Sequence, residues 1–415
     1  MKLWNKYHYQ ISVFVILALT AFLCLEIARD IFREGDFGGY IEAGKLAWTH
    51  SHIYDAHRNT WPPFMSITAI PLHGLNSISF IGLRLVWLLG ICITYWYIFK
   101  WVLRHFFQKK LVLKLKSKIL REVALTNPLF LVPFLLNFRI FIEEVSNLQV
   151  NMSIMAICIV SLILTLKKQH LWAGLLLALV ISTKVYPIIL LPFLLFKKEF
   201  RTLAYTLFGL ALTHLIVTMY FGAGSDSLYL EWYTKQVSNG LQCTHLNQSL
   251  WSLVCGLFSE TSRFNNWYFN IFSFTVSHTK LITLSIIGII GIWVAYVFYK
   301  YKDSKNALAT QWLIVLSFIP IFSPLAWKCY FVFLVPVCIL LYFKFQESHL
   351  KKWFIIPFLF ITFTSELFIG NRWSDYSESI GIITLSSLII SLFATHFLHI
   401  QNEKISLPST DSNSL

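Results

Sequence analysis

A single aspartate in the first long polar segment of the chain is the residue best suited to acid–base chemistry. Asp36 sits between glycines in REGDFGGYIEAG, just past an apolar run. A carboxylate there could accept the proton of an acceptor hydroxyl, as the general base of an inverting sugar transfer does. Helix capping is an equally good interpretation, because Asp is a favoured N-cap residue and a helical pattern follows at 37–48. Tyr40, one turn on, is expected to line the same side. Weaker candidates for the base are Glu42, His50, His52, Asp55 and His57.

A second group of polar residues enters an apolar run at EEVSNLQVN, which supplies Asn147, Gln149 and Asn151. Amides at a membrane edge need partners, either in neighbouring helices or in a polyhydroxyl ligand. Lys184 is a lone cation at a helix break among Leu and Ile, which is costly unless it meets an anion. Its side chain could extend to lipid headgroups, but we favour the phosphate of a lipid carrier as its partner.

Two further segments carry candidate binding residues. Asn247 and Gln248 precede a short apolar helix, and SPLAWKCY contains Trp327 and Lys328. An aromatic ring such as Trp327 suits the face of a sugar, although aromatic residues at membrane interfaces are common.

The composition shows which elements must position these residues. Of 415 residues, 56% are hydrophobic and only 13% are charged, where a soluble globular protein has about 25% charged residues. The net charge of +14 would suggest nucleic acid in a soluble protein, but the apolar runs make this an all-α polytopic membrane protein, and no nucleic-acid partner is expected.

Apolar runs long enough to cross about 30 Å of hydrocarbon predict about twelve spans. A pair lies within 170–196, broken at Lys184 and Pro187, and the others lie near 10–29, 77–99, 123–141, 150–166, 201–221, 279–299, 308–323, 329–344, 353–370 and 380–399. The proline-rich run 61–75 and the run 248–258 are better suited to re-entrant or interfacial helices.

The basic residues predict the orientation of these spans. With the amino terminus inside, the inner segments hold 22 of the 34 Lys and Arg residues and six acidic residues. This asymmetry follows the positive-inside rule. Nearly all the candidate site residues then lie at or near the outer face, while the basic stretch 109–121 is expected to rest on anionic headgroups.

Several classes of chemistry lack a motif. The chain has no GxxxxGKS phosphate loop, no GxGxxG after a strand, no HExxH helix and no CxxC pair. The seven cysteines are interpreted as small core residues, with neither a disulfide framework nor a metal site. An outward-facing enzyme would therefore need an already activated donor that arrives through the membrane, and we expect no cofactor and no metal.

The order and approximate spacing of several segments resemble the polyprenol-phosphate-mannose-dependent mannosyltransferases of glycosyltransferase family 87. These segments are GDFGGYIEAG with IYD and WPPF, NLQVN, STKVYP with LPFLL, NQSL and SPLAWKCY, and they extend over roughly 300 residues. The resemblance implies a GT-C type fold, an outward active site, a donor sugar on a polyprenyl phosphate, and an inverting transfer with Asp36 as general base. It also places Lys184 at the family's basic turn.

Two positions depart from the family pattern. Leu148 replaces the glycine before the Gln of the GQxN motif, and Cys329 replaces a histidine. The second change removes a hydrogen-bonding group from the site, which Lys328 could replace only if its side chain turns inward.

The expected protein is thus a plasma (inner) membrane hexosyltransferase that moves mannose from a polyprenyl-phosphate donor to a lipid or glycan acceptor. Residues 1–400 form the transmembrane domain with outward loops 30–76 and 222–278, and 401–415 form a disordered cytoplasmic tail. The alternatives are a transporter or flippase of a polyprenyl-linked sugar, a GT-C enzyme with another donor sugar, and an inactive relative that only binds.

Overall fold

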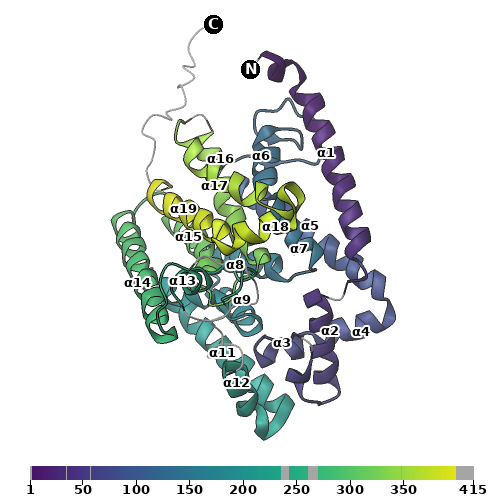
Figure 1. Cartoon of the computed structure of the whole chain (residues 1–415), viewed down its shortest axis with the longest axis vertical. Coiled ribbons are helices and arrows are strands. Elements are labelled where there is room, and N and C mark those ends of the chain that lie inside the picture. Colours follow the sequence, from purple (N-terminus) through teal and green to yellow (C-terminus); the bar gives the residue numbers. More distant parts are fainter. Residues whose placement is uncertain are drawn as a thin grey trace.

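The computed structural model describes residues 2–33, 35–56, 58–234, 243–259, 270–346 and 348–398. His57, the tail 401–415 and parts of the loop 222–278 therefore lie outside the described residues. The described chain is almost entirely helical, as predicted (Figure 1). Its α-helices are α1 Lys2–Asp30, α2 Gly35–Trp48, α3 Pro63–Thr68, α4 Ile70–Ile78, α5 Phe80–Phe107, α6 Pro128–Leu136, α7 Phe138–Ser146, α8 Asn151–Leu166, α9 His170–Thr183, α10 Leu190–Phe196, α11 Phe200–Phe221, α12 Ser225–Trp232, α13 Leu250–Phe258, α14 Val276–Lys300, α15 Ala307–Phe322, α16 Val335–Phe345, α17 Lys351–Phe363, α18 Glu366–Ser379 and α19 Ile382–Phe397.

Short elements complete the described chain. Strands β1 Lys110–Leu111 and β2 Glu122–Val123 pair in parallel. The 3-10 helices are η1 Ile53–Asp55, η2 Tyr186–Ile189, η3 Gly222–Gly224 and η5 Lys328–Leu334.

Five segments of the described chain are long and apolar enough to cross a membrane, which confirms the integral membrane character. They are Tyr9–Asp30, Phe80–Phe107, Phe200–Phe221, Val276–Lys300 and Lys328–Phe345. Their surroundings differ. Only 6% of the apolar window in Tyr9–Asp30 is buried, against 89% in Lys328–Phe345. The first segment therefore presents its apolar side chains outward, as contact with lipid requires, and the last forms the centre of the core.

Two predicted spans are not single straight helices. The run 123–141 begins with β2 and is then divided at Asn137, where α6 ends and α7 begins. The Asn137 amide donates to the carbonyl of Pro133 at 2.8 Å and closes the last turn of α6. The run 353–370 ends its first helix at Phe363, and α18 leaves α17 at 90° because its sequence turns polar. A similar bend of 114° separates α7 from α8. With each bent pair counted as one span, the described residues hold up to seven candidates.

Other predicted breaks and short helices are confirmed. Residues 170–196 divide at Lys184 into α9, η2 and α10. The proline-rich run 61–75 forms the short helices α3 and α4, and the run 248–258 forms α13. These helices are too short to cross the hydrocarbon by themselves.

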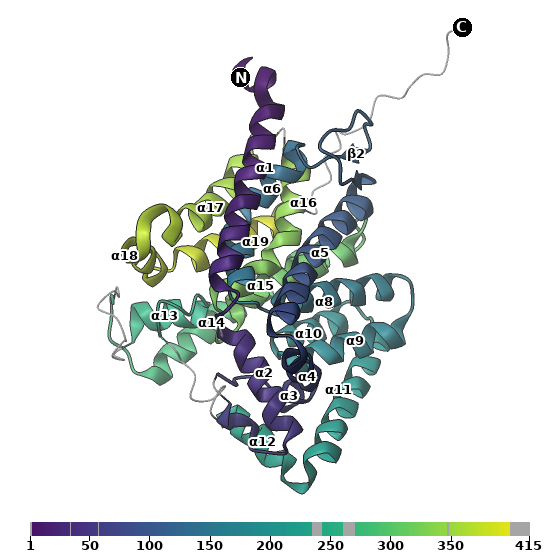
Figure 2. The ribbon, with the colours of Figure 1, turned by 90° about the vertical axis from the view of Figure 1, so that its right-hand side faces the viewer.

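The helices are arranged so that the two ends of the molecule differ. The start of α1 and the small β1–β2 ladder lie at one end, whereas α2, α3, α4 and α12 lie at the other (Figures 1 and 2). The basic stretch 109–121 thus lies at the same end as the start of the first span, as the charge distribution predicted.

One prediction about the cysteines is wrong. Cys243 and Cys255 form a disulfide that ties the segment before α13 to that helix, with their Cα atoms 5.6 Å apart. The two cysteines are 12 residues apart and form no CxxC motif, so the sequence did not indicate a disulfide. They meet because α13 packs against the segment before it.

Candidate active site

A cavity of about 890 Å³ lies among α1, α2, α7, the segment 325–330 and the junction of α17 with α18. Its size falls in the range of small-ligand sites, about 300–1,000 Å³. Of the predicted site residues, Asp36, Asn147, Gln149, Trp327 and Lys328 line it. Five residues predicted from the sequence thus line one cavity, although they come from three segments that are far apart in the chain.

Asp36 lies in the first turn of α2, with its side chain 29% exposed. Its Oδ2 accepts a hydrogen bond from the amide nitrogen of Gln149, and its Oδ1 lies 3.7 Å from the guanidinium of Arg58. The partners that the structure describes for this carboxylate are thus two side chains from distant segments, which goes beyond a helix cap. One carboxylate oxygen is fixed by Gln149, and the group as a whole faces the cavity.

The side chain of Gln149 is held in one orientation. Its Oε1 accepts from the hydroxyl of Tyr40 at 3.1 Å and from the ammonium of Lys184 at 3.3 Å. Burial, with a smaller contribution from Asp36, raises the pKa of Tyr40 well above its usual range, so the phenol stays protonated and donates. Since Oε1 faces these donors, the amide nitrogen must face Asp36.

Lys184 lies behind this layer, with only 3% of the residue exposed. Its ammonium donates to Asn151 Oδ1 at 3.1 Å, and the Asn151 amide in turn donates to Glu144 at 3.2 Å. The fully buried Glu144 also accepts from the backbone N–H of Met152 at 2.7 Å. The buried cation is therefore balanced through Asn151 by a buried carboxylate. Lys184 is not among the described residues that line the cavity, so contact between its ammonium and a phosphate stays a prediction.

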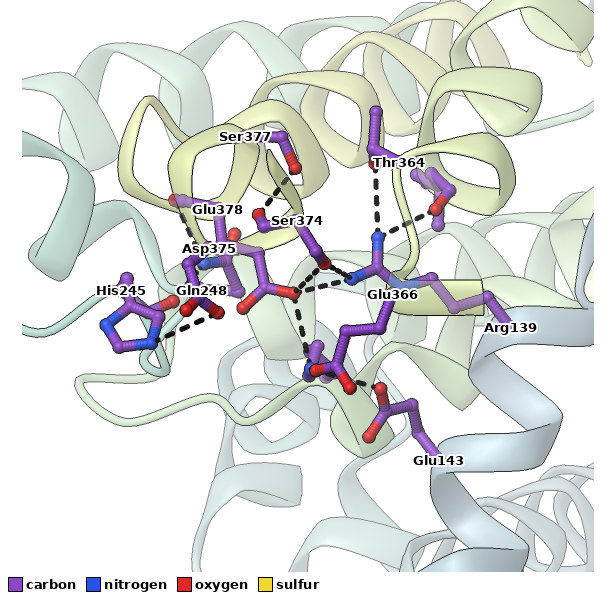
Figure 3. Close-up of polar contacts among 12 residues, drawn as sticks. Arg139, Glu143, His245, Gln248, Thr364, Glu366, Ser374, Asp375, Ser377 and Glu378 are labelled. Carbon is purple, nitrogen blue, oxygen red and sulfur yellow. Dashed lines mark hydrogen bonds and ion pairs between the residues drawn. The ribbon is translucent and has the colours of Figure 1, made fainter. Parts of the chain in front are cut away.

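The opposite wall of the cavity carries a network of ion pairs. The Lys328 ammonium lies 3.2 Å from Glu143, 3.2 Å from Glu378 and 3.4 Å from Glu366. Glu378 also pairs with Arg139 at 2.5 Å, and both of those side chains are almost fully buried. Figure 3 shows Arg139, Glu143, Glu366 and Glu378 of this network close together. The network fixes the Lys328 side chain at the cavity wall.

Asn247 and Gln248 make contacts of a different kind. Asn247 Oδ1 accepts from the backbone of Ala326 at 2.9 Å, and its amide donates to the carbonyl of Pro324 at 3.0 Å. The Gln248 amide donates to the carbonyl of Glu378 at 3.1 Å. Neither is among the described residues that line the cavity. They hold its wall together, and their contact with a sugar stays a prediction.

Comparison with known proteins places these residues in a family. The model of glycosyltransferase family 87 matches residues 59–324, which is more than half of the chain. The chain belongs to glycosyltransferase family 87. It is therefore a membrane glycosyltransferase. The matched range includes Gln149 and Lys184 and begins after Asp36. No curated protein and no solved structure matches the chain.

The backbone at Leu148 has a conformation that favours the glycine expected from the resemblance. Leu148 has a φ of +48°, in the left-handed region that glycine adopts without cost. The next N–H, that of Gln149, donates to the carbonyl of Glu144 at 3.0 Å and closes the end of α7. The family's glycine therefore suits a turn that this glycosyltransferase makes with a leucine, whose side chain is 3% exposed.

Several cations of this family 87 glycosyltransferase were missed by the sequence analysis. Arg29, Arg33 and Arg58 line the same cavity as Asp36. Arg29 is paired with Glu26 at 2.6 Å and with Asp30 at 2.9 Å. The signal was present in the sequence, because Arg29 lies in the last turn of the first span and Arg33 follows that span directly. Arg58 lies in the same polar segment as Asp36, one residue after His57.

Proposed function

We propose that this glycosyltransferase transfers a hexose, with mannose as the leading candidate, from a polyprenyl-phosphate donor to a lipid or glycan acceptor on the outer face of the membrane. The observation that carries the proposal is the carboxylate of Asp36, oriented by Gln149 at the edge of a cavity lined with cations. A carboxylate and cations in one cavity suit an acceptor hydroxyl and an anionic donor.

In the proposed reaction, Asp36 takes the proton of the acceptor hydroxyl as its oxygen attacks the anomeric carbon. The bond between that carbon and the phosphate oxygen breaks, and the polyprenyl phosphate leaves with the electron pair. Attack opposite the leaving group inverts the anomeric centre. The residues supply position and charge, because the donor is already activated.

The leaving phosphate gains negative charge, so nearby cations stabilise the transition state. Arg58 lines the cavity beside Asp36, and Lys328 lines the other wall. We propose these two as the cations nearest the phosphate, with Arg33 at the cavity's edge. Lys184 contributes from behind by holding Gln149 and Asn151 in place, and it would reach the phosphate only if those amides released it.

The sugar would be held by amides and aromatic faces. Asn147 and Gln149 line the cavity and can reach hydroxyl groups, whereas Asn151, Asn247 and Gln248 lie behind it and would act through those that line it. Trp327 and Trp61 offer ring faces. The ring of Tyr40 is fully buried against Trp61 with centroids 4.4 Å apart, so we propose that it supports Trp61 rather than touching the sugar.

The proposed orientation puts the amino terminus in the cytoplasm of a cell with the protein in its plasma membrane. Two observations support it. The basic stretch 109–121 lies at the end opposite α2 (Figure 2). The Cys243–Cys255 disulfide lies in the predicted outward loop, and disulfides persist in oxidising compartments outside the cytosol.

Donor specificity is tested with the purified protein in lipid nanodiscs. We expect transfer of label from polyprenyl-phosphate-mannose to a lipid extract, and slower transfer from the glucose and arabinose donors. If transfer from another sugar donor were faster, that sugar would replace mannose in the proposal, and the proposed mechanism would stand. If every donor gave no transfer but moved across the bilayer of a proteoliposome, the protein would be a transporter and the proposal would be wrong.

A further inference from the structure

A histidine and two carboxylates meet beside the cavity wall, outside the residues assigned to sugar transfer. His245 belongs to the segment before α13, and Asp375 and Glu378 belong to α18. One ligand atom from each lies within 4.8 Å of the others. His245 Nε2 lies 3.6 Å from Asp375 Oδ1. A nitrogen and two carboxylate oxygens from two separate segments form a possible metal-ligand set.

Glu378 supplies an independent indication of a ligand. Its side chain is fully buried, and its Oε1 accepts from Arg139 while pairing with Lys328. Its Oε2 has no hydrogen-bond partner among the described residues. In Figure 3 this second oxygen is turned toward Asp375 and His245, away from Arg139. A buried carboxylate oxygen without a partner is costly, and a cation between these three side chains would satisfy it.

A third oxygen, on the side chain of Gln248, belongs to the same region. The amide nitrogen of Gln248 donates to the carbonyls of Glu378 and His245, so the side chain is fixed between the two segments. Its Oε1 is buried and has no hydrogen-bond partner among the described residues. Two oxygens in one small region thus lack the partner that a cation would provide.

The local charge also favours a cation. The network pairs two basic side chains, Arg139 and Lys328, with three carboxylates, and Asp375 adds a fourth. With His245 neutral, as a metal ligand must be, the carboxylates of this group outnumber its cations. A divalent cation would reduce this excess of negative charge in a partly buried site.

We propose that His245, Asp375 and Glu378 bind a divalent metal ion, with the amide oxygen of Gln248 as a fourth ligand. One imidazole with three oxygens suits Mn²⁺ or Zn²⁺, whereas Mg²⁺ and Ca²⁺ prefer oxygen alone. Metal–ligand bonds are about 2.0–2.2 Å long, so ligand atoms within 4.8 Å of one another need only small side-chain shifts.

The ion would connect two parts of the cavity wall. The segment with His245 and Gln248 is already tied to α13 by Cys243–Cys255. Binding to Asp375 and Glu378 would fix that segment on α18, whose Glu378 also holds Lys328. The site is therefore structural, and its occupancy can be measured without a transfer assay.

Metal content is measured on the full-length protein in detergent, purified without a histidine tag, stripped with EDTA and dialysed against Mn²⁺ or Zn²⁺. We expect about one ion per chain for the wild type. Asp375→Asn and His245→Gln should each weaken binding by more than about 10-fold, the smallest loss expected for a residue near a metal. The matched control removes another histidine–aspartate pair, His214 and Asp226, whose atoms lie 3.8 Å apart at the surface. His214→Gln with Asp226→Asn should bind as the wild type does.

Binding of no ion by the wild type, or equal binding by the wild type and Asp375→Asn, would overturn the proposal. An equal loss in the control pair would do the same, because it would indicate adventitious surface binding. A second measurement needs no variant. The electron spin-echo spectrum of the Mn²⁺-loaded wild type should show coupling to an imidazole ¹⁴N nucleus. If this coupling were absent, His245 would not be a ligand and the proposed site would be wrong.

Discussion

The amide nitrogen of Gln149 donates a hydrogen bond to the carboxylate of Asp36, across 113 positions of sequence. The same side chain accepts from Tyr40 and Lys184. It also accepts from the Asn151 amide at 3.4 Å. Gln149 therefore connects the proposed base to a buried polar layer, and its amide cannot rotate without breaking these bonds.

Replacing Gln149 should affect the reaction more than substrate binding. A hydrogen bond to a charged group contributes about 1.5–3 kcal/mol, so Gln149→Leu is expected to lower kcat by about 10- to 100-fold with a smaller change in KM. Steady-state kinetics on the purified variant check this. A change confined to KM would mean that Gln149 binds sugar and does not position Asp36.

The ion pair of Arg139 with Glu378 should be strongly coupled. Both side chains are nearly fully buried, and removing one partner of such a pair costs about 3–5 kcal/mol. Arg139→Gln is therefore expected to lower the thermal midpoint markedly. The double variant Arg139→Met with Glu378→Leu should lose less stability than the sum of the losses for Arg139→Met alone and Glu378→Leu alone. Thermal unfolding of these variants is measured by circular dichroism. Additive losses of stability would contradict the pairing.

Leu148 offers a test of backbone strain. A left-handed conformation costs a non-glycine residue about 1–2 kcal/mol, so Leu148→Gly should leave the protein more stable than Leu148→Ala, although glycine is smaller. At Leu177, buried in the middle of α9, the order should reverse, because glycine costs about 1 kcal/mol relative to alanine in a helix. The same order of stability at both positions would show that Leu148 is unstrained.

Gly44 sets the distance between α2 and the junction of α3 with α4. A Cβ atom there would lie 2.3 Å from the carbonyl oxygen of Ala69, a backbone atom that cannot move aside cheaply. Gly44→Ala is expected to cost about 1–3 kcal/mol and to reduce transfer, because α2 also carries Asp36. Gly90→Ala in α5 is the matched control, since it meets open space. Equal stability of the two variants, measured by thermal unfolding, would contradict this packing.

The helices could be predicted from the sequence where a local property decides them. Long apolar runs predicted the five candidate spans. The charge of Lys184 and the ring of Pro187 predicted the break after α9. The division at Asn137 was missed, because an apolar run does not show where one amide will end a helix.

The site could be predicted only in part, for a similar reason. Asp36 and Gln149 stand out by residue type, but their contact depends on how α2 packs near the turn after α7. The contacts of Lys184 with Gln149 and Asn151 were not predicted, because they depend on the packing of segments that lie far apart in the chain. Its contact with a phosphate stays a prediction. Arg58 was overlooked for the same reason, since nothing local indicates that it approaches Asp36.

The central claim is that Asp36 is the general base, and parallel transfer assays test it most directly. Label from polyprenyl-phosphate-mannose is followed into a lipid extract with the wild type, Asp36→Asn and the control Asp55→Asn, whose side chain is 76% exposed. Each variant is first shown to be folded and inserted. A general base contributes about 100-fold or more, so Asp36→Asn should lose at least that factor while Asp55→Asn transfers as the wild type does. Near-normal transfer by folded Asp36→Asn would contradict the account.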